Sequence, residues 1–292
     1  MTQAWPAEPE LDAWLAGLRP RLHRYCARMT GSAIDGEDVV QEALLKALEA
    51  GGAAVARPEA WLFRIAHNAA LDFLRRRTRE AARIAEAELA DLPDPTPASP
   101  PAADSLRAFL ALTPAERSCT ILMDVLGHSL AEVAAETGMT LPAVKAALHR
   151  GRGRLREAPR EAPPPALSPA DRARLQTYAD LFNRRDFDGL RARLADDVRL
   201  ELVSRFRVEG RETVGSYFGN YAAITDWRAV PAEIEGRAAL AIHAPDDPSG
   251  PPLYVILLSW RGDQVAAIRD FRYARYVTAD VAPRPTPPPA AA

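Results

Sequence analysis

A cluster of cationic side chains near the middle of this sequence is the feature with the clearest chemistry. Residues 143–160 include six lysine or arginine residues and one acidic residue, Glu157. The cations recur at the spacing of a helix, with Val144 and Leu148 on the opposite side. Cations gathered on one helical face can neutralise nucleic-acid phosphates, so this segment predicts binding chemistry rather than catalysis.

Two helices joined by a glycine turn would hold these cations. Ser129 and Glu132 have the spacing of a capping box, which predicts a short helix through about Thr137. Gly138 permits a left-handed turn, and Thr140 caps the next helix. This arrangement is typical of a helix-turn-helix in the major groove, although a solvated helical hairpin with solubilising arginines fits the pattern equally well. The candidate base contacts are Thr140, Pro142, Ala143, Lys145 and Ala146, and the candidate phosphate contacts are His149, Arg150 and Arg152.

A second candidate binding surface lies on a predicted helix at 38–50, which Gly51 ends. The inward stripe of this helix is Val40, Ala43, Leu44, Ala47 and Leu48. The acidic and hydrogen-bonding side chains at its beginning are Glu37, Asp38, Gln41 and Glu42. They suit docking on a basic partner helix. Alternatively, they are favourable charges at a helix N-terminus, worth only tenths of a kcal/mol.

A third group of polar side chains lies on a predicted helix at 58–79. The group consists of Asn68, Asp72, Arg75, Arg76 and Arg79. Asn68 could read a base and the arginines could follow a melted strand, but Asp72 and Arg76 could equally form an i,i+4 ion pair. Trp61 at the start of this helix is expected to lie in the core rather than to stack on a base.

The composition limits the class of protein. The net charge of the 292 residues is only −2, so a nucleic-acid site must come from local clustering. Cys26 and Cys119, the only cysteines, argue against a disulfide framework and favour a reducing cytoplasm. Neither CxxC nor HxxxH occurs, and we expect no metal and no cofactor. The N-terminus lacks the apolar core of a signal peptide, and no apolar run approaches the ~20 residues that span a bilayer, so we expect no membrane association.

Proline-rich segments divide the chain, because 15 of its 26 prolines fall in three short stretches. The expected parts are a helical module at 11–85, a linker at 86–107, a helix-turn-helix module at 108–157, a linker at 158–170, a third domain at 171–279 and a disordered tail at 280–292. The expected fold is thus multidomain, with two all-α modules followed by an α+β domain.

The third domain is expected to begin with helices and to continue with an antiparallel sheet. The helices are expected near Leu175–Phe182 and Leu190–Leu194. The strands are expected at Val198–Val203, Trp227–Glu235, Ala238–His243, Leu253–Trp260 and Val265–Val277.

The helical modules resemble the extracytoplasmic-function (ECF) sigma factors of the sigma-70 family. Ser129–Arg156 (SLAEVAAETGMTLPAVKAALHRGRGRLR) resembles region 4.2, and Leu112–Arg117 (LTPAER) resembles the start of region 4.1. Asp35–Leu48 resembles region 2.2, and Arg57–Arg77 resembles regions 2.3 and 2.4. The resemblance implies docking on the β′ clamp of RNA polymerase, opening and reading of the −10 element, and reading of the −35 element. The implied partners are core RNA polymerase, through its β′ and β subunits, and promoter DNA.

The third domain resembles the SnoaL-like (nuclear-transport-factor-2-like) fold, a cone of helices on a curved sheet. The segments that carry the resemblance are Tyr178–Leu200, Gly210–Phe218 and Ile268–Tyr276. In sigma factors this extension is thought to regulate in cis, and a pocket in it would take an unknown small-molecule ligand. The candidate pocket residues are Tyr178, Asp226, Trp227, Tyr254 and Asp270. For Asp270, pairing with an arginine as a structural contact is the favoured interpretation.

The sequence therefore predicts a sigma factor that is not an enzyme and whose C-terminal domain regulates it in cis. Two alternatives remain. One is a DNA-binding regulator that never binds core polymerase, and the other is a SnoaL-like enzyme with a recruiting front end.

Overall fold

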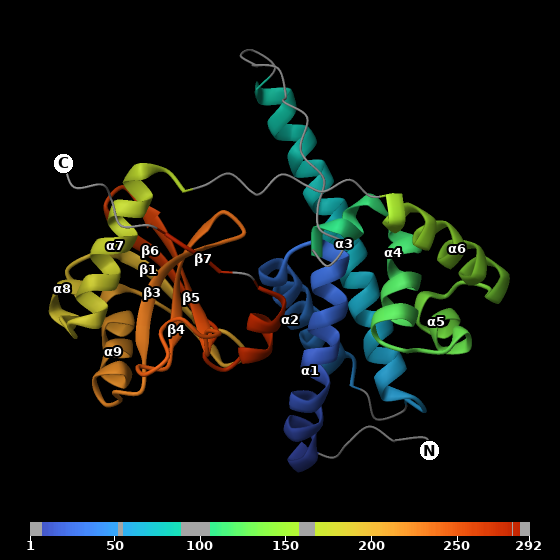
Figure 1. The fold of residues 1–292 in the computed structure, drawn as a ribbon. Coiled ribbons are helices and arrows are strands. Elements are labelled where there is room, and N and C mark those ends of the chain that lie inside the picture. The colour runs from blue at the N-terminus through green and yellow to red at the C-terminus, as the bar shows by residue number, and fades with distance from the viewer. Residues whose placement is uncertain (1–7, 52–54, 89–105, 158–166, 282, 287–292) are drawn as a thin grey trace. The chain divides into compact units, whose positions relative to one another are not determined.

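The computed structural model describes residues 8–51, 55–88, 106–157, 167–281 and 283–286 (Figure 1). The chain divides into two compact units, Met1–Pro163 and Pro164–Ala292. Most of both predicted linkers, and the end of the predicted tail, lie outside the described residues. None of the described helices is both long and apolar enough to cross a membrane.

Three helices make up the first part of the N-terminal unit, and the predicted all-α class is confirmed. They are α1 (Glu8–Thr30), α2 (Ala33–Ala50) and α3 (Pro58–Glu88). Helix α2 begins five residues before the predicted start, because the Ser32 hydroxyl accepts a hydrogen bond from the Asp35 backbone N–H at 3.0 Å. Glu37 therefore lies in the second turn of α2, where it is buried, and not at a helix N-terminus.

The second part of this unit is the predicted helix-turn-helix with a helical lead-in. It comprises a 3₁₀ helix (Leu106–Ala111), α4 (Pro114–Thr120), a π-helical turn (Ile121–Val125), α5 (Leu130–Thr137) and α6 (Leu141–Glu157). The predicted capping box of Ser129 with Glu132 forms, and Thr113 with Glu116 forms another at the start of α4. Gly138 ends α5 in the left-handed region with φ 71°, as its position in the sequence predicts.

Both parts contribute to one hydrophobic core. Leu22 of α1 and Leu62 of α3 belong to the same cluster of buried residues as Leu122, Val133 and Leu148. This shared core holds the candidate binding residues of α2, α3 and α6 on a single body.

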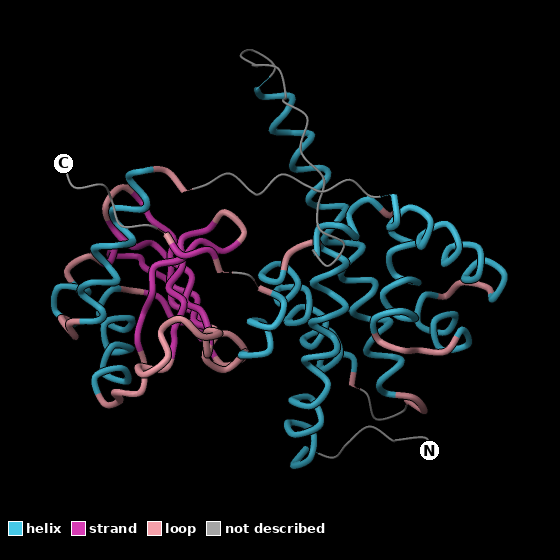
Figure 2. Tube along the Cα trace, in the orientation of Figure 1, coloured by secondary structure: helices cyan, strands magenta, loops and turns pink. Residues whose placement is uncertain are grey.

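The C-terminal unit is an α+β cone, in which helices cover one face of a seven-stranded sheet (Figure 2). The helices are α7 (Pro169–Asn183), α8 (Phe187–Arg191) and α9 (Arg211–Ala222). The strands are β1 (Leu194–Leu202), β2 (Phe206–Glu209), β3 (Arg228–Ile234), β4 (Arg237–His243), β5 (Tyr254–Arg261), β6 (Gln264–Asp270) and β7 (Arg284–Pro285), in the order β2-β1-β6-β5-β4-β3-β7. The predicted α+β class is confirmed, but the sheet is mixed because β1 pairs with β6 in parallel.

Several predicted elements of this unit are wrong in extent. Leu194 begins a strand instead of ending a helix, and α9 and β2 were not predicted. The strand expected to reach Val277 ends at Asp270, because the Asp270 carboxylate accepts the Arg272 backbone N–H at 2.8 Å and the chain turns. The segment expected to be a disordered tail contributes β7, whose Arg284 pairs with Glu233 of β3.

Candidate nucleic-acid interface

The outer face of α6 presents most of the predicted DNA contacts together. The exposed members of the set are Thr140, Pro142, Lys145, Ala146, His149, Arg150 and Arg152, and Ala143 is half-buried. Val144 and Leu148 are buried on the inner face. Gly151 lies so close to α4 that an added Cβ would stand 2.6 Å from Thr120 Oγ1, so the helix packs tightly against its support.

Acidic residues of the same unit hold three arginines of α6. The Arg150 Nε donates to Glu116 at 3.0 Å, and Arg154 pairs with the other oxygen of that carboxylate. Arg152 makes a bidentate pair with Asp124 at 2.9 and 2.6 Å. These pairs turn the arginines toward α4 and the π-helical turn. No sequence signal identified Glu116 or Asp124 as partners, because each is more than 25 residues away along the chain.

The predicted residues of α3 lie on one face of the helix, and the ion pair considered as the alternative role of Asp72 is made with a different arginine. Asp72 pairs with Arg75 at 3.0 Å and not with Arg76. Arg76 instead reaches Glu42 of α2 at 2.9 Å. Asn68 is exposed on the same helix. Trp61 packs half-buried against the core, as expected.

The candidate docking residues of α2 differ in their exposure to solvent. Glu37 is fully buried, whereas Asp38, Gln41 and Glu42 are half-buried. Glu42 also accepts a hydrogen bond from Lys46 at 2.7 Å. Two exposed apolar side chains of this helix were not among the predicted site residues. They are Leu45 and Leu48, which are 60% and 49% exposed, and Leu48 was expected to face inward.

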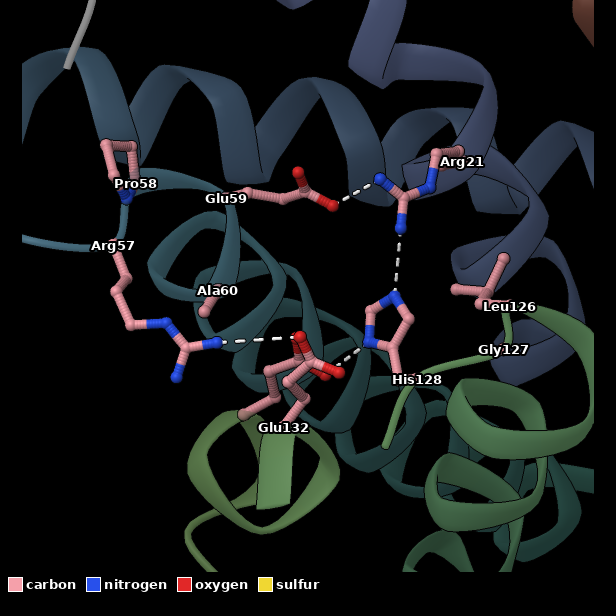
Figure 3. A pocket seen from close by; sticks show the side chains of 10 residues that line it. Arg21, Arg57, Pro58, Glu59, Ala60, Leu126, Gly127, His128 and Glu132 are labelled. Carbon is pink, nitrogen blue, oxygen red and sulfur yellow. Dashed lines mark hydrogen bonds and ion pairs between the residues drawn. The ribbon is translucent and has the colours of Figure 1, made fainter. Parts of the chain in front are cut away.

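A polar pocket of about 520 Å³ lies between the two parts of the N-terminal unit (Figure 3). His128 stands at its centre, where Nε2 is 3.0 Å from the Arg21 guanidinium and Nδ1 is 2.8 Å from Glu136. Arg21 also pairs with Glu59. These contacts join α1 and the start of α3 to α5, and the sequence singled out none of the four residues that make them.

Two of the candidate pocket residues of the C-terminal unit are linked through Tyr221, whose hydroxyl lies 3.2 Å from that of Tyr254 and donates to Asp270. Asp270 is fully buried and accepts hydrogen bonds from the Tyr217 and Tyr221 hydroxyls, each at 2.7 Å, while the charge of Arg272, a residue of the expected type, acts on it electrostatically. Burial raises the pKa of Asp270, and it raises the pKa of Tyr254 to about 12. Asp226 is exposed.

The two remaining members of that set pack in the core. Tyr178 stacks on Phe182 and meets the Trp260 ring edge-on. Trp227 is also buried, with its ring centroid 4.7 Å from that of Phe182. Neither residue reaches Asp270 through a hydrogen bond in the part of the chain that the structure describes.

Comparison with known proteins places two family models on the N-terminal unit. The model of sigma-70 region 2 matches residues 15–80, and the model of sigma-70 region 4 matches residues 106–155. The first segment holds α2 and most of α3, and the second holds the helix-turn-helix. The candidate binding residues of α2 and α3 therefore fall in one family segment, and those of α6 fall in the other.

Similar curated proteins carry ECF RNA polymerase sigma factor names. SigE of Mycolicibacterium smegmatis is 31% identical over 52% of this chain and 62% of its own length. SigG of Mycobacterium tuberculosis is 37% identical over 47% of this chain and 45% of its own length. SigM of M. tuberculosis is 31% identical over 46% of this chain and 69% of its own length. The chain thus spans between about half and two thirds of the length of these relatives.

Among solved structures, the ECF sigma factor SigJ of M. tuberculosis is similar along most of the chain. It is 20% identical, covers 89% of this chain and 95% of its own, and gives a TM-score of 0.35.

Proposed function

The chain belongs to the ECF RNA polymerase sigma factors, and on this premise we propose that it directs core RNA polymerase to promoters. The observation that carries the proposal is the exposed outer face of α6, where Lys145 and His149 follow one another at helical spacing. The first turn of α6 would contact base edges of the −35 element, and the ammonium group of Lys145 would neutralise phosphate charge.

The region 2 segment, residues 15–80, would bind the polymerase and the −10 element. On α2, the half-buried polar residues Asp38, Gln41 and Glu42 would contact the β′ subunit together with exposed Leu45 and Leu48. On α3, Asn68 and the arginines from Arg75 to Arg79 are exposed on one helix and would follow the melted strand.

We further propose that the C-terminal unit regulates initiation in cis and performs no catalysis. The family itself is not enzymatic. Asp270, the carboxylate best placed for acid–base chemistry by its burial, already accepts hydrogen bonds from Tyr217, Tyr221 and the Arg272 backbone. A carboxylate engaged in this way is suited to holding α9 against the sheet rather than to exchanging protons with a substrate.

Transcription with purified core polymerase tests the proposal. The full chain should direct initiation from promoters in a genomic library, and Asp38→Ala with Glu42→Ala should weaken both co-purification with core and transcription. Glu49→Ala, an exposed change on the same helix, should leave both unchanged. A chain that binds DNA but never co-purifies with core would instead be a regulator of another kind.

Deletion of the residues after Ala158 tests regulation in cis. Promoter output that is the same with and without these residues would contradict regulation in cis.

An enzymatic turnover by the full chain that Asp270→Asn abolishes would contradict the absence of catalysis.

A further inference from the structure

Leu141 is a large apolar side chain that remains exposed at the beginning of α6. It is 46% exposed, one of only five exposed large hydrophobic residues in the described part of the chain. It follows Thr140, whose hydroxyl accepts the Ala143 backbone N–H at 3.4 Å. An exposed leucine costs solvation free energy that a binding partner could recover.

The side chains around Leu141 offer few hydrogen bonds to a base. Pro142 and Ala146 are exposed and apolar, and the Thr140 hydroxyl already serves as the helix cap. Arg150 and Arg152, which could form bidentate contacts to guanine, are held by Glu116 and Asp124. The first turn of α6 therefore presents apolar side chains. Many recognition helices instead present side chains that form two hydrogen bonds to one base.

The major groove contains one apolar recognition group, the C5 methyl of thymine. We propose that Leu141 reads a thymine methyl in the −35 element and is a specificity-determining residue of this chain. This inference rests on the proposed function, because it assigns a base preference to the same helix. The residues one and two turns later, Lys145 and His149, lie on the same exposed stripe, and Lys145 supplies positive charge beside the contact.

That charge is the reason for assigning DNA, and not an apolar protein groove, as the occupant. A phosphate backbone complements the stripe that begins at Leu141, whereas an apolar groove would have to desolvate Lys145 four residues later. The experiment below distinguishes this DNA contact from a contact of Leu141 with the polymerase.

Replacement of thymine by deoxyuridine isolates the proposed contact, because it removes the methyl group and retains base pairing. The full chain would first select duplexes from a randomised pool in the presence of core polymerase. Each thymine in the selected −35 footprint would then be replaced singly by deoxyuridine. The affinity should fall about fourfold at one or two adjacent positions, the loss expected for one buried methyl group.

Variants of the chain decide which residue makes the contact. Leu141→Ala should bind the thymine and deoxyuridine duplexes equally, whereas Leu141→Met should retain the preference. Phe206→Ala, which removes a side chain that is 51% exposed in the C-terminal unit, should also retain it.

Three results would overturn the inference. Wild-type chain that binds every deoxyuridine duplex as well as its thymine parent would show that no methyl group is read. Leu141→Ala that keeps the full preference would assign the methyl contact to another residue. Leu141→Ala that weakens binding to core polymerase without DNA would assign this leucine to a protein contact. A pool that yields no enriched sequence would instead contradict the proposed function itself.

Discussion

The Nδ1 atom of His128 lies 2.8 Å from Oε2 of Glu136, and both side chains are more than nine-tenths buried. On the other side of the imidazole ring, Nε2 lies 3.0 Å from the Arg21 guanidinium. Because arginine can only donate, Nε2 accepts and Nδ1 carries the proton that it donates to Glu136. One imidazole ring thus connects α1, in the region 2 segment, to α5, in the region 4 segment.

His128→Ala is expected to loosen the packing between these two segments. The change removes the donor to a buried carboxylate, which costs about 1–3 kcal/mol, and it also removes the ring that meets Phe63 edge-on at 5.1 Å. Dyes on cysteines introduced at Glu49 and Arg156, both exposed, should report a lower transfer efficiency in the variant. The native cysteines Cys26 and Cys119 are buried and should not label.

Arg57→Ala provides the matched control for this contact. Arg57 also joins the segments, through Glu132 at 3.6 Å, but both side chains of that pair are about half exposed. Exposed ion pairs of this kind contribute about 0–1 kcal/mol. Equal transfer efficiency in His128→Ala and the wild type would show that the buried ring does not hold the segments together.

Glu116→Gln is expected to strengthen nonspecific DNA binding. The buried Glu116 carboxylate neutralises Arg150 and Arg154, and glutamine can still complete the capping box with Thr113. The released arginines could then contact phosphates, which should steepen the slope of log affinity against log salt by up to about 2. Fluorescence anisotropy with a mixed-sequence duplex measures that slope.

Glu132→Gln makes the equivalent change in the second capping box and should leave the slope unchanged, because Glu132 pairs with Arg57 and not with α6. A shallower slope in Glu116→Gln would mean that Glu116 positions the arginines for phosphate instead of withholding them.

The sequence predicted those elements whose signals are local. The capping box of Ser129 with Glu132 and the left-handed Gly138 depend on residues within a few positions of each other, and they form as expected. The predicted helix starts and strand ends were wrong where a single side chain decides the boundary. Ser32 moves the start of α2, and the carboxylate of Asp270 ends β6.

Long-range partners could not be predicted in the same way. Glu116 lies 34 residues before Arg150, and Asp270 lies 53 residues after Tyr217, so no periodicity relates them. The shared core of the N-terminal unit also depends on tertiary packing, which helical periodicity describes for one helix at a time.

His67 is expected to make the N-terminal unit less stable in acid. Burial lowers the pKa of His67 to about 4, and its Nδ1 lies 2.8 Å from the Tyr25 hydroxyl. The unfolded chain, with an ordinary pKa near 6.5, binds more protons between these values, so stability present above pH 6.5 is lost as the pH falls toward 4. The loss should amount to about 3 kcal/mol.

Calorimetry from pH 7 to pH 4 measures this loss in the unfolding transition of the N-terminal unit. His67→Gln cannot take up a proton and should reduce the pH dependence of the N-terminal transition. A variant that loses as much stability in acid as the wild type would assign the acid sensitivity to other groups.

Asp270 should give the C-terminal unit the opposite pH dependence. Because burial raises its pKa in the folded state, the fold favours the protonated carboxyl, and stability falls as the pH rises through that folded-state pKa. Asp270→Asn keeps an acceptor oxygen for Tyr217 and Tyr221 but has no charge to bury, so the variant should flatten this dependence.

Asp270→Ala separates the hydrogen bonds from the charge. It leaves the Tyr217 and Tyr221 hydroxyls and the Arg272 backbone N–H without their acceptor, at about 1–3 kcal/mol for each buried group. The unfolding transition of the C-terminal unit should therefore drop well below that of Asp270→Asn. Asp226→Asn, on an exposed carboxylate, should match the wild type. If the alanine variant were as stable as the asparagine variant, the tyrosine–carboxylate contacts would not be what secures α9 to the sheet.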